Sequence, residues 1–259
     1  MQNLLFIFIL LSSVLVSSLT QAHAAKLAII IDDIGYRVTD KAALSLPQTI
    51  TLSILPHTPL GQKLAQDGHN KGHEIMLHLP MQALNGKALG PGGLTNEMTE
   101  QQIKQQVNSA FATIPFAKGA NNHMGSLLTQ MDNPMLWVMQ SLKQQQLFFV
   151  DSVTTKYTKA SDKAEQVGVP LLKRQVFLDN DVRESALEKQ FTKIIQRAKQ
   201  EGKLVAIAHP YPETIRFLRA NLARLEANGI TLVHTSALLD DATVNVATSG
   251  NANPTVTLK

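Results

Sequence analysis

The sequence predicts an α/β protein whose most economical architecture is a closed (β/α) barrel of seven or eight parallel strands. About eight strand-like runs alternate with helical patterns through short connections, an order typical of a parallel sheet covered by helices. The chain has 259 residues, 44% of them hydrophobic and 17% charged, which is enough apolar material for a large globular core. An open doubly wound sheet is the alternative, and it is disfavoured because no G-x-G-x-x-G sequence follows the first strand.

The first half of the chain contains four expected strands, recognised as short apolar or β-branched runs. They cover residues 26–31, 49–55, 74–79 and 118–124. Helical patterns follow the first three, over a stretch reaching to about residue 45, then over 59–72 and 99–114. The last of these has apolar residues at helical spacing, and Thr99 is its expected N-cap.

The second half continues the alternation. Strands are expected over residues 147–150, 169–178, 203–208 and 230–233. Helices are expected over residues 133–145, 185–202 and 212–229. Pro134 and Pro212 stand in the first turns of two of these helices, where a missing backbone N–H carries no cost, and Gly229 ends the last one.

The N-terminal residues 1–24 are typical of a secretory signal peptide. An apolar run over residues 4–16 precedes Ala-His-Ala at 22–24, which matches the small-x-small cleavage pattern and predicts cleavage after Ala24. An uncleaved membrane anchor is the alternative, but the run is shorter than the roughly 20 residues that a span needs. We therefore expect a periplasmic or secreted protein with no stable membrane span after cleavage.

The remaining chain is expected to form one domain over residues 26–238, followed by a disordered tail over 239–259 that is small and polar. There are no cysteines, which excludes disulfides, thiolate catalysis and thiolate metal sites, so any metal must be held by His, Asp or Glu. The net charge is +4, and no dense run of Lys and Arg indicates a nucleic-acid partner.

Carboxylates and imidazoles recur directly at the ends of the expected strands. In chain order these residues are Asp32, Asp33, His57, His78, His123, Asp151, Asp179, His209 and His234. The carboxyl ends of barrel strands converge on one mouth, which carries the active site in barrel enzymes. A single histidine at a strand end is more often structural, and an aspartate before a helix is more often a cap, but their coincidence at one rim favours a functional cluster.

The chemistry open to such a cluster is limited. One Asp and two His form a typical ligand set for a divalent ion, with zinc expected, and leave a position for water. A second carboxylate can act as base toward that water, and a further His can act as acid for the leaving group. The residues therefore predict metal-assisted hydrolysis of an acyl or related bond.

Several segments resemble the divergent polysaccharide deacetylases, a branch related to the NodB-type carbohydrate esterases. The resemblance covers residues 26–238 and is carried by IIIDDIGY, GHEIMLHLPMQ, GANNHMGS, FFVDS, RQVFLDND and VAIAHP. It implies a barrel that is often distorted or incomplete. It also implies that Asp32 is the catalytic base, Asp33 and His78 are metal ligands, and His209 is the general acid with Asp151 near it.

The chain departs from the main family at one ligand position. That family has a second His four residues after the first, and here the residue is Gln82. We expect His123, at the end of the adjacent strand, to replace it as a ligand. The Arg-Pro-Pro segment of the main family is also missing, so substrate handling is expected to differ.

Two functions follow from the resemblance. The first is an exported metal-dependent hydrolase that removes N- or O-acetyl groups from a cell-envelope glycan. The second is a catalytically degenerate protein that binds glycan or a cell-wall partner without turnover, which the substitution at Gln82 favours. A cytoplasmic enzyme acting on a phosphorylated sugar is disfavoured by the signal peptide.

Overall fold

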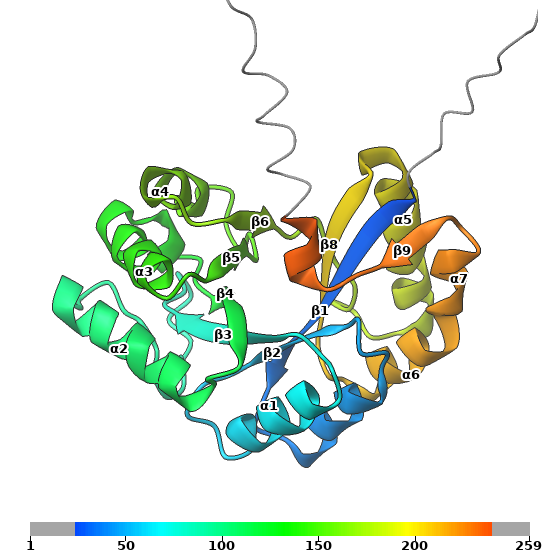
Figure 1. Cartoon of the computed structure of the whole chain (residues 1–259), viewed down its shortest axis with the longest axis horizontal. Coiled ribbons are helices and arrows are strands. Elements are labelled where there is room, and N and C mark those ends of the chain that lie inside the picture. The colour runs from blue at the N-terminus through cyan, green and yellow to red at the C-terminus, as the bar shows by residue number, and fades with distance from the viewer. Residues whose placement is uncertain (1–23, 240–259) are drawn as a thin grey trace, which may run out of the picture.

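A computed structural model describes residues 24–239 of the chain. The predicted signal peptide and the predicted tail lie almost entirely outside this range. None of the helices within it is long and apolar enough to cross a membrane. The strands lie at the centre and the helices surround them on the outside (Figure 1).

Nine strands form one sheet in which every pairing is parallel. They are β1 (Ala25–Ile34), β2 (Thr51–Ile54), β3 (Ile75–Met81), β4 (Ala117–Met124), β5 (Phe148–Asp151), β6 (Leu171–Lys173), β7 (Val176–Phe177), β8 (Lys203–Ala208) and β9 (Ile230–Leu232). The order is β6-β5-β4-β3-β2-β1-β8-β7, and β9 pairs with β1. The sheet curls into an incomplete barrel, so the predicted fold class is confirmed.

The barrel is interrupted where one expected strand, over residues 169–178, divides into β6 and β7. The backbone N–H of Arg174 still donates to β5, at Asp151 O (2.9 Å), whereas that of Gln175 donates to β8, at Val205 O (2.9 Å). The chain thus changes partner strand within two residues. Within residues 24–239, β6 and β7 stand at the two ends of this strand order and do not pair with each other.

Most helices lie where the periodicity predicts them, with small differences at the ends. The helices are α1 (Gly61–Asn70), α2 (Glu100–Thr113), α3 (Asp132–Gln144), α4 (Ala160–Val167), α5 (Glu184–Glu201), α6 (Pro212–Asn221) and α7 (Ala223–Glu226), with 3-10 helices η1 (Val38–Ser45), η2 (Leu128–Gln130) and η3 (Thr235–Leu238). However, α4 was not expected, and the helical stretch expected up to about residue 45 is the 3-10 helix η1. Thr99 caps α2 as expected, because its hydroxyl accepts from the backbone N–H of Gln102. The expected helix over 212–229 is divided into α6 and α7.

The last strand differs in position from the expectation. β9 pairs with Ala25–Leu27 at the start of β1. Lys26 and Leu27 pair with β8 on one side of β1, so β9 lies on the other side. β2 pairs along that same side, but only from Ile30 onward. β9 therefore lies beside the amino end of β1.

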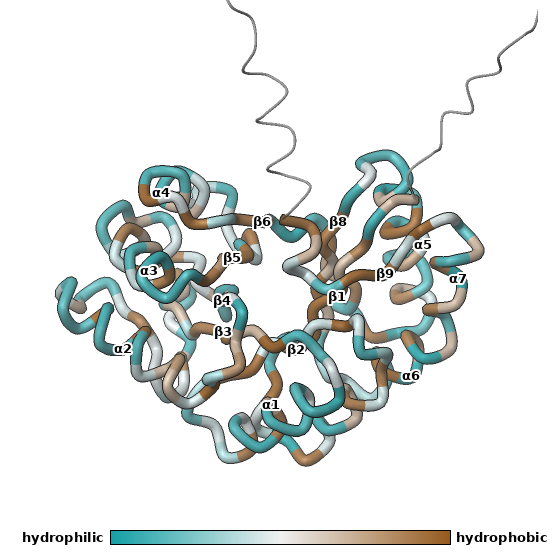
Figure 2. The backbone as a smooth tube through the Cα atoms, in the orientation of Figure 1, coloured by the Kyte–Doolittle hydropathy of each residue, from teal (hydrophilic) through white to brown (hydrophobic). Residues whose placement is uncertain are grey.

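Two apolar layers hold the strands in place. On β1, Leu27, Ile29 and Ile31 pack outward into the layer shared with the helices. Ala28 and Ile30 point inward and pack with residues of β3, β5, β6 and β8, together with Leu238 of η3. Hydrophobic residues accordingly gather on the strands, and hydrophilic residues on the outer sides of the helices (Figure 2). The alternation of inward and outward side chains along each strand decides which residue at the strand end faces the barrel interior.

Candidate metal centre

The two adjacent aspartates reach the same end of the barrel because β1 contains a bulge. Side chains alternate along a strand, so Asp32 points inward like Ile30, and Asp33 would be expected to point outward. From Ile31 to Ile34, β1 has three steps where the paired stretch of β2 has two, and Asp33 adopts a left-handed backbone with φ 59°. A bulge of this kind re-aims a side chain, so Asp33 also faces the mouth.

The loop after β1 is held by a buried carboxylate. Asp40 Oδ2 accepts hydrogen bonds from the backbone N–H groups of Gly35 (3.0 Å) and Arg37 (2.9 Å). Gly35 has φ +142°, and a Cβ there would meet Thr58 Oγ1 at 2.2 Å. The Asp40 carboxylate therefore fixes the backbone of the loop that follows Asp33.

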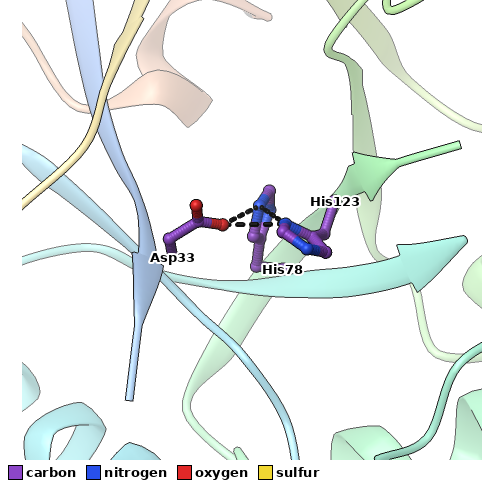
Figure 3. A group of neighbouring side chains, drawn as sticks. All are labelled: Asp33, His78 and His123. Carbon is purple, nitrogen blue, oxygen red and sulfur yellow. Dashed lines mark hydrogen bonds and ion pairs between the residues drawn. The ribbon is translucent and has the colours of Figure 1, made fainter. Parts of the chain in front are cut away.

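Asp33, His78 and His123 converge at the carboxyl ends of β1, β3 and β4 (Figure 3). His78 Nε2 lies 3.0 Å from Asp33 Oδ1, and His123 Nδ1 lies 2.8 Å from the same oxygen. The two imidazole nitrogens are 3.1 Å apart. His78 is almost completely buried, whereas the side chains of Asp33 and His123 are partly open to solvent.

The donor set and its geometry suit a divalent cation. Three ligand atoms form a nearly equilateral triangle, close to the edge of about 3.3 Å expected for tetrahedral zinc with bonds of about 2.0–2.1 Å. Asp33 Oδ1 is buried and makes no hydrogen bond of acceptable geometry, although two nitrogens lie within 3.0 Å of it. Burial alone would raise the pKa of Asp33, but His123 and His78 outweigh it and lower that pKa below its ordinary range. The carboxylate is therefore ionised and available to a cation.

Asp32 stands beside this triangle in a different environment. It is buried, and both of its oxygens lie 2.9 Å from Asn121 Nδ2. Burial raises its pKa, against the opposing influence of His78 and His209. The neighbouring carboxylates thus differ in character: Asp33 is held as an anion, whereas Asp32 has a raised affinity for a proton, which suits a base.

His209 faces the same space from the end of β8. Its Nε2 lies 3.9 Å from Asp33 Oδ2. Its Nδ1 donates to Asp179 Oδ1 at 2.9 Å, while Asp179 Oδ2 accepts from the backbone N–H of His209 and from Thr214 Oγ1. Burial would lower the pKa of His209, but Asp179, then Asp33 and Asp32, raise it to about 9. The imidazole is therefore protonated near neutral pH and can donate a proton.

The carboxylate beside His209 is Asp179 and not Asp151, which we expected there. On β5, Phe149 packs outward against the helices and Val150 faces the interior. Asp151 is two residues after Phe149, so its side chain also points outward. Asp151 Oδ1 accepts from the backbone N–H of Val153 at 2.8 Å, and burial raises the pKa of Asp151. It supports the loop after β5, and Asp179 takes the expected place.

The other candidate residues lie apart from the triangle. Gln82 turns toward the loop before α2, where its Oε1 accepts from the backbone N–H of Asn96 at 2.7 Å. His234 follows β9 at the amino end of the barrel, and its ring bonds Gln48 O. His57 follows β2 in a left-handed conformation, packed near Gly92.

Backbone strain is concentrated at the same rim. Among the described non-glycine residues, five have positive φ, and four of them lie at or shortly after the carboxyl ends of strands: Asp33, His57, Met124 and Val153. Strained conformations of this kind gather at functional sites, where the surrounding structure holds them. Together with the triangle, Asp32 and the Asp179–His209 pair, they form a site that can hold a cation between a base and an acid.

A family model and a curated protein both match most of the chain in sequence. A model of the family described as divergent polysaccharide deacetylase matches residues 29–239. An uncharacterized protein of Escherichia coli strain K12, YibQ, is 40% identical over 226 residues, which cover 87% of this chain and 70% of that protein.

Solved structures share the fold. An uncharacterized protein of Agrobacterium tumefaciens C58, ATU2773, has a TM-score of 0.80 and 23% identity, covering 85% of this chain and 91% of that one. A mutant of BA3943, described as a CE4 family pseudoenzyme with restored enzymatic activity, has a TM-score of 0.52 and 12% identity, covering 84% and 68%. At these identities the two structures support the architecture alone.

Proposed function

The chain belongs to the divergent polysaccharide deacetylase family, and from this premise we propose that it is a metal-dependent hydrolase that removes acetyl groups from a cell-envelope glycan. The observation that carries the proposal is the convergence of Asp33, His78 and His123 between a carboxylate of raised pKa and a protonated imidazole. Such a set has the ligands, the base and the acid that hydrolysis of an acyl group needs.

In this proposal Asp33, His78 and His123 hold a divalent cation, with zinc favoured by the oxygen and nitrogen donors. When bound, the ion supplies Lewis acidity, which polarises the acyl oxygen and acidifies water. His123 would then replace the second histidine ligand of the main family, whose position is taken here by Gln82. The Gln82 amide is already engaged with Asn96, which supports this replacement.

The remaining residues move protons. Asp32 accepts a proton from the attacking water, for which its raised pKa is suited. His209 donates a proton to the departing nitrogen or oxygen, and Asp179 keeps its Nδ1 protonated and its ring oriented so that Nε2 faces the site. Different environments thus give the two groups different roles, with Asp32 as the base and His209 as the acid.

We also propose that the protein is exported, so that it acts in the periplasm or outside the cell. The support is the apolar run over residues 4–16 followed by Ala-His-Ala at 22–24. A glycan of the cell envelope is the acetylated polymer that an exported member of this family would meet.

A degenerate protein that binds glycan without turnover is the second candidate, favoured by the glutamine at position 82. The test is to purify residues 25–259, measure bound metal by mass spectrometry and assay acetate release from acetylated envelope glycans. We expect one equivalent of metal, lost in His78→Ala and His123→Ala and kept in the control His69→Ala, whose imidazole stacks on Phe116 away from the site. Wild-type protein without stoichiometric metal would overturn the hydrolase, and metal without acetate release would favour the binding role.

A further inference from the structure

Asn121 is buried at the inward side of β4 and contacts both halves of the proposed centre. Its side chain touches Asp32, the proposed base, and His78, the proposed ligand. A completely buried amide inside a barrel costs free energy unless all its groups are bonded. Its contacts therefore indicate what it does there.

The orientation of the amide follows from its partners. Nδ2 lies 2.9 Å from each oxygen of Asp32, and only the N–H₂ group can donate to a carboxylate. Oδ1 then faces the other way, where it accepts from Ser53 Oγ at 2.6 Å and lies 2.8 Å from His78 Nδ1. An amide oxygen only accepts, so His78 Nδ1 carries the proton.

This assignment sets the tautomer of His78. With the proton on Nδ1, the lone pair of the neutral ring is on Nε2, the atom that lies 3.0 Å from Asp33 Oδ1 and 3.1 Å from His123 Nδ1. Metal-binding histidines usually donate their second N–H to an oxygen acceptor, such as a carboxylate or a carbonyl, and loss of that acceptor typically weakens metal affinity by about 10–100-fold.

We infer that Asn121 is a positioning residue, whose one amide both presents His78 Nε2 to the cation and orients Asp32 beside it. The inference rests on the proposed function. No other uncharged side chain of this length has a donor for a carboxylate and an acceptor for an imidazole. Aspartate would keep the acceptor and lose the donor, and alanine would lose both.

The next residue is a matched control. Asn122 is equally buried, but it faces the loop after β5: its Nδ2 donates to Met124 O at 2.7 Å, and its Oδ1 accepts from the backbone N–H of Ser152 at 2.9 Å. The same substitution at Asn122 removes three side-chain hydrogen bonds from the same strand without touching His78 or Asp32.

The test measures Zn²⁺ affinity by chelator competition and the visible absorption of the Co²⁺-loaded protein. We expect Asn121→Ala to weaken Zn²⁺ binding by about 10–100-fold and to alter the Co²⁺ spectrum. Asn122→Ala is expected to stay within about threefold of wild type. Asn121→Asp, which keeps an acceptor for His78 Nδ1, is expected to recover the affinity to within about threefold or to exceed it.

The outcomes separate this inference from the proposed function. A wild-type chain that binds no metal would refute the metal centre itself. A wild-type chain that binds metal, with Asn121→Ala binding equally well or Asn121→Asp as weakly as the alanine variant, would overturn the role of Asn121 alone. If Asn121→Ala does not fold, Asn121→Ser takes its place, because a serine hydroxyl is too short to reach both partners.

Discussion

The pair formed by Asp179 and His209 can be tested by removing a single charge. Asp179→Asn keeps the shape of the side chain and the possibility of accepting from the backbone N–H of His209 and from Thr214. It removes the carboxylate that lies 2.9 Å from His209 Nδ1. If this carboxylate is what holds the imidazole protonated, the pKa of His209 must fall in the variant.

The magnitude follows from the environment of His209. Its pKa of about 9, against an ordinary value of 6.5, corresponds to roughly 3 kcal/mol of preference for the charged ring. Asp179 is the first of the groups that raise it, ahead of Asp33 and Asp32. A carboxylate at this distance typically changes a pKa by about 1–3, so we expect the pKa of His209 to fall to about 6–8.

The measurement is an NMR titration of the histidine ring protons in protein freed of metal by chelation. The control is Asp181→Asn, the same substitution on an exposed carboxylate that pairs with Arg183, and it should leave His209 unchanged. A His209 pKa that stays near 9 in Asp179→Asn would refute the reasoning.

The same linkage predicts a pH dependence of stability. A pKa that is raised on folding stabilises the protein fully below about pH 6.5, and this contribution is lost as the pH rises through about 9. The difference in unfolding free energy between wild type and Asp179→Asn should therefore shrink between pH 7 and 10, and a difference independent of pH would contradict it.

Three further predictions concern the support of the site and the core. Asp40→Ala removes the acceptor of two backbone N–H groups in the loop after β1 and should lower the unfolding free energy by about 1–3 kcal/mol in denaturant titration; an unchanged midpoint would contradict it. Gln82→Ala should leave metal affinity within about threefold of wild type, because the Gln82 amide bonds Asn96; loss of metal would make Gln82 a ligand after all. Phe149→Ala should cost about 3–5 kcal/mol, since the ring is completely buried, whereas Tyr157→Ala, at an exposed ring, should cost under about 0.5 kcal/mol.

Much of the site was accessible from the order of residues, because parallel strands bring their carboxyl ends together. Asp32, Asp33, His78, His123 and His209 were expected at one rim, and the structure brings them together there. The expected interruption of the barrel is present as well, and the chain changes partner strand within the polar residues 173–175, which divide the strand expected over 169–178.

Strand alternation explains why Asp151 lies away from His209. On β5, Phe149 packs outward and Val150 inward, so alternation turns Asp151 away from the interior. On β7 and β8 the same rule turns Asp179 and His209 inward, and there they bond each other. Period-two alternation therefore separates Asp179 from Asp151, but it fails at Asp33, which strict alternation turns outward.

The sequence by itself determined most of the strands, their parallel direction and the kinds of side chain at their ends, because hydrophobic periodicity and short connections are local properties. Tertiary structure alone decided that Asp33 faces the mouth, since this depends on a bulge between β1 and β2 and a backbone with φ 59°. It also decided that the amide of Asn121 contacts both Asp32, which is 89 positions away in the chain, and His78, which is 43 positions away. Contacts of this kind depend on strand register, and register is settled only when the whole sheet packs.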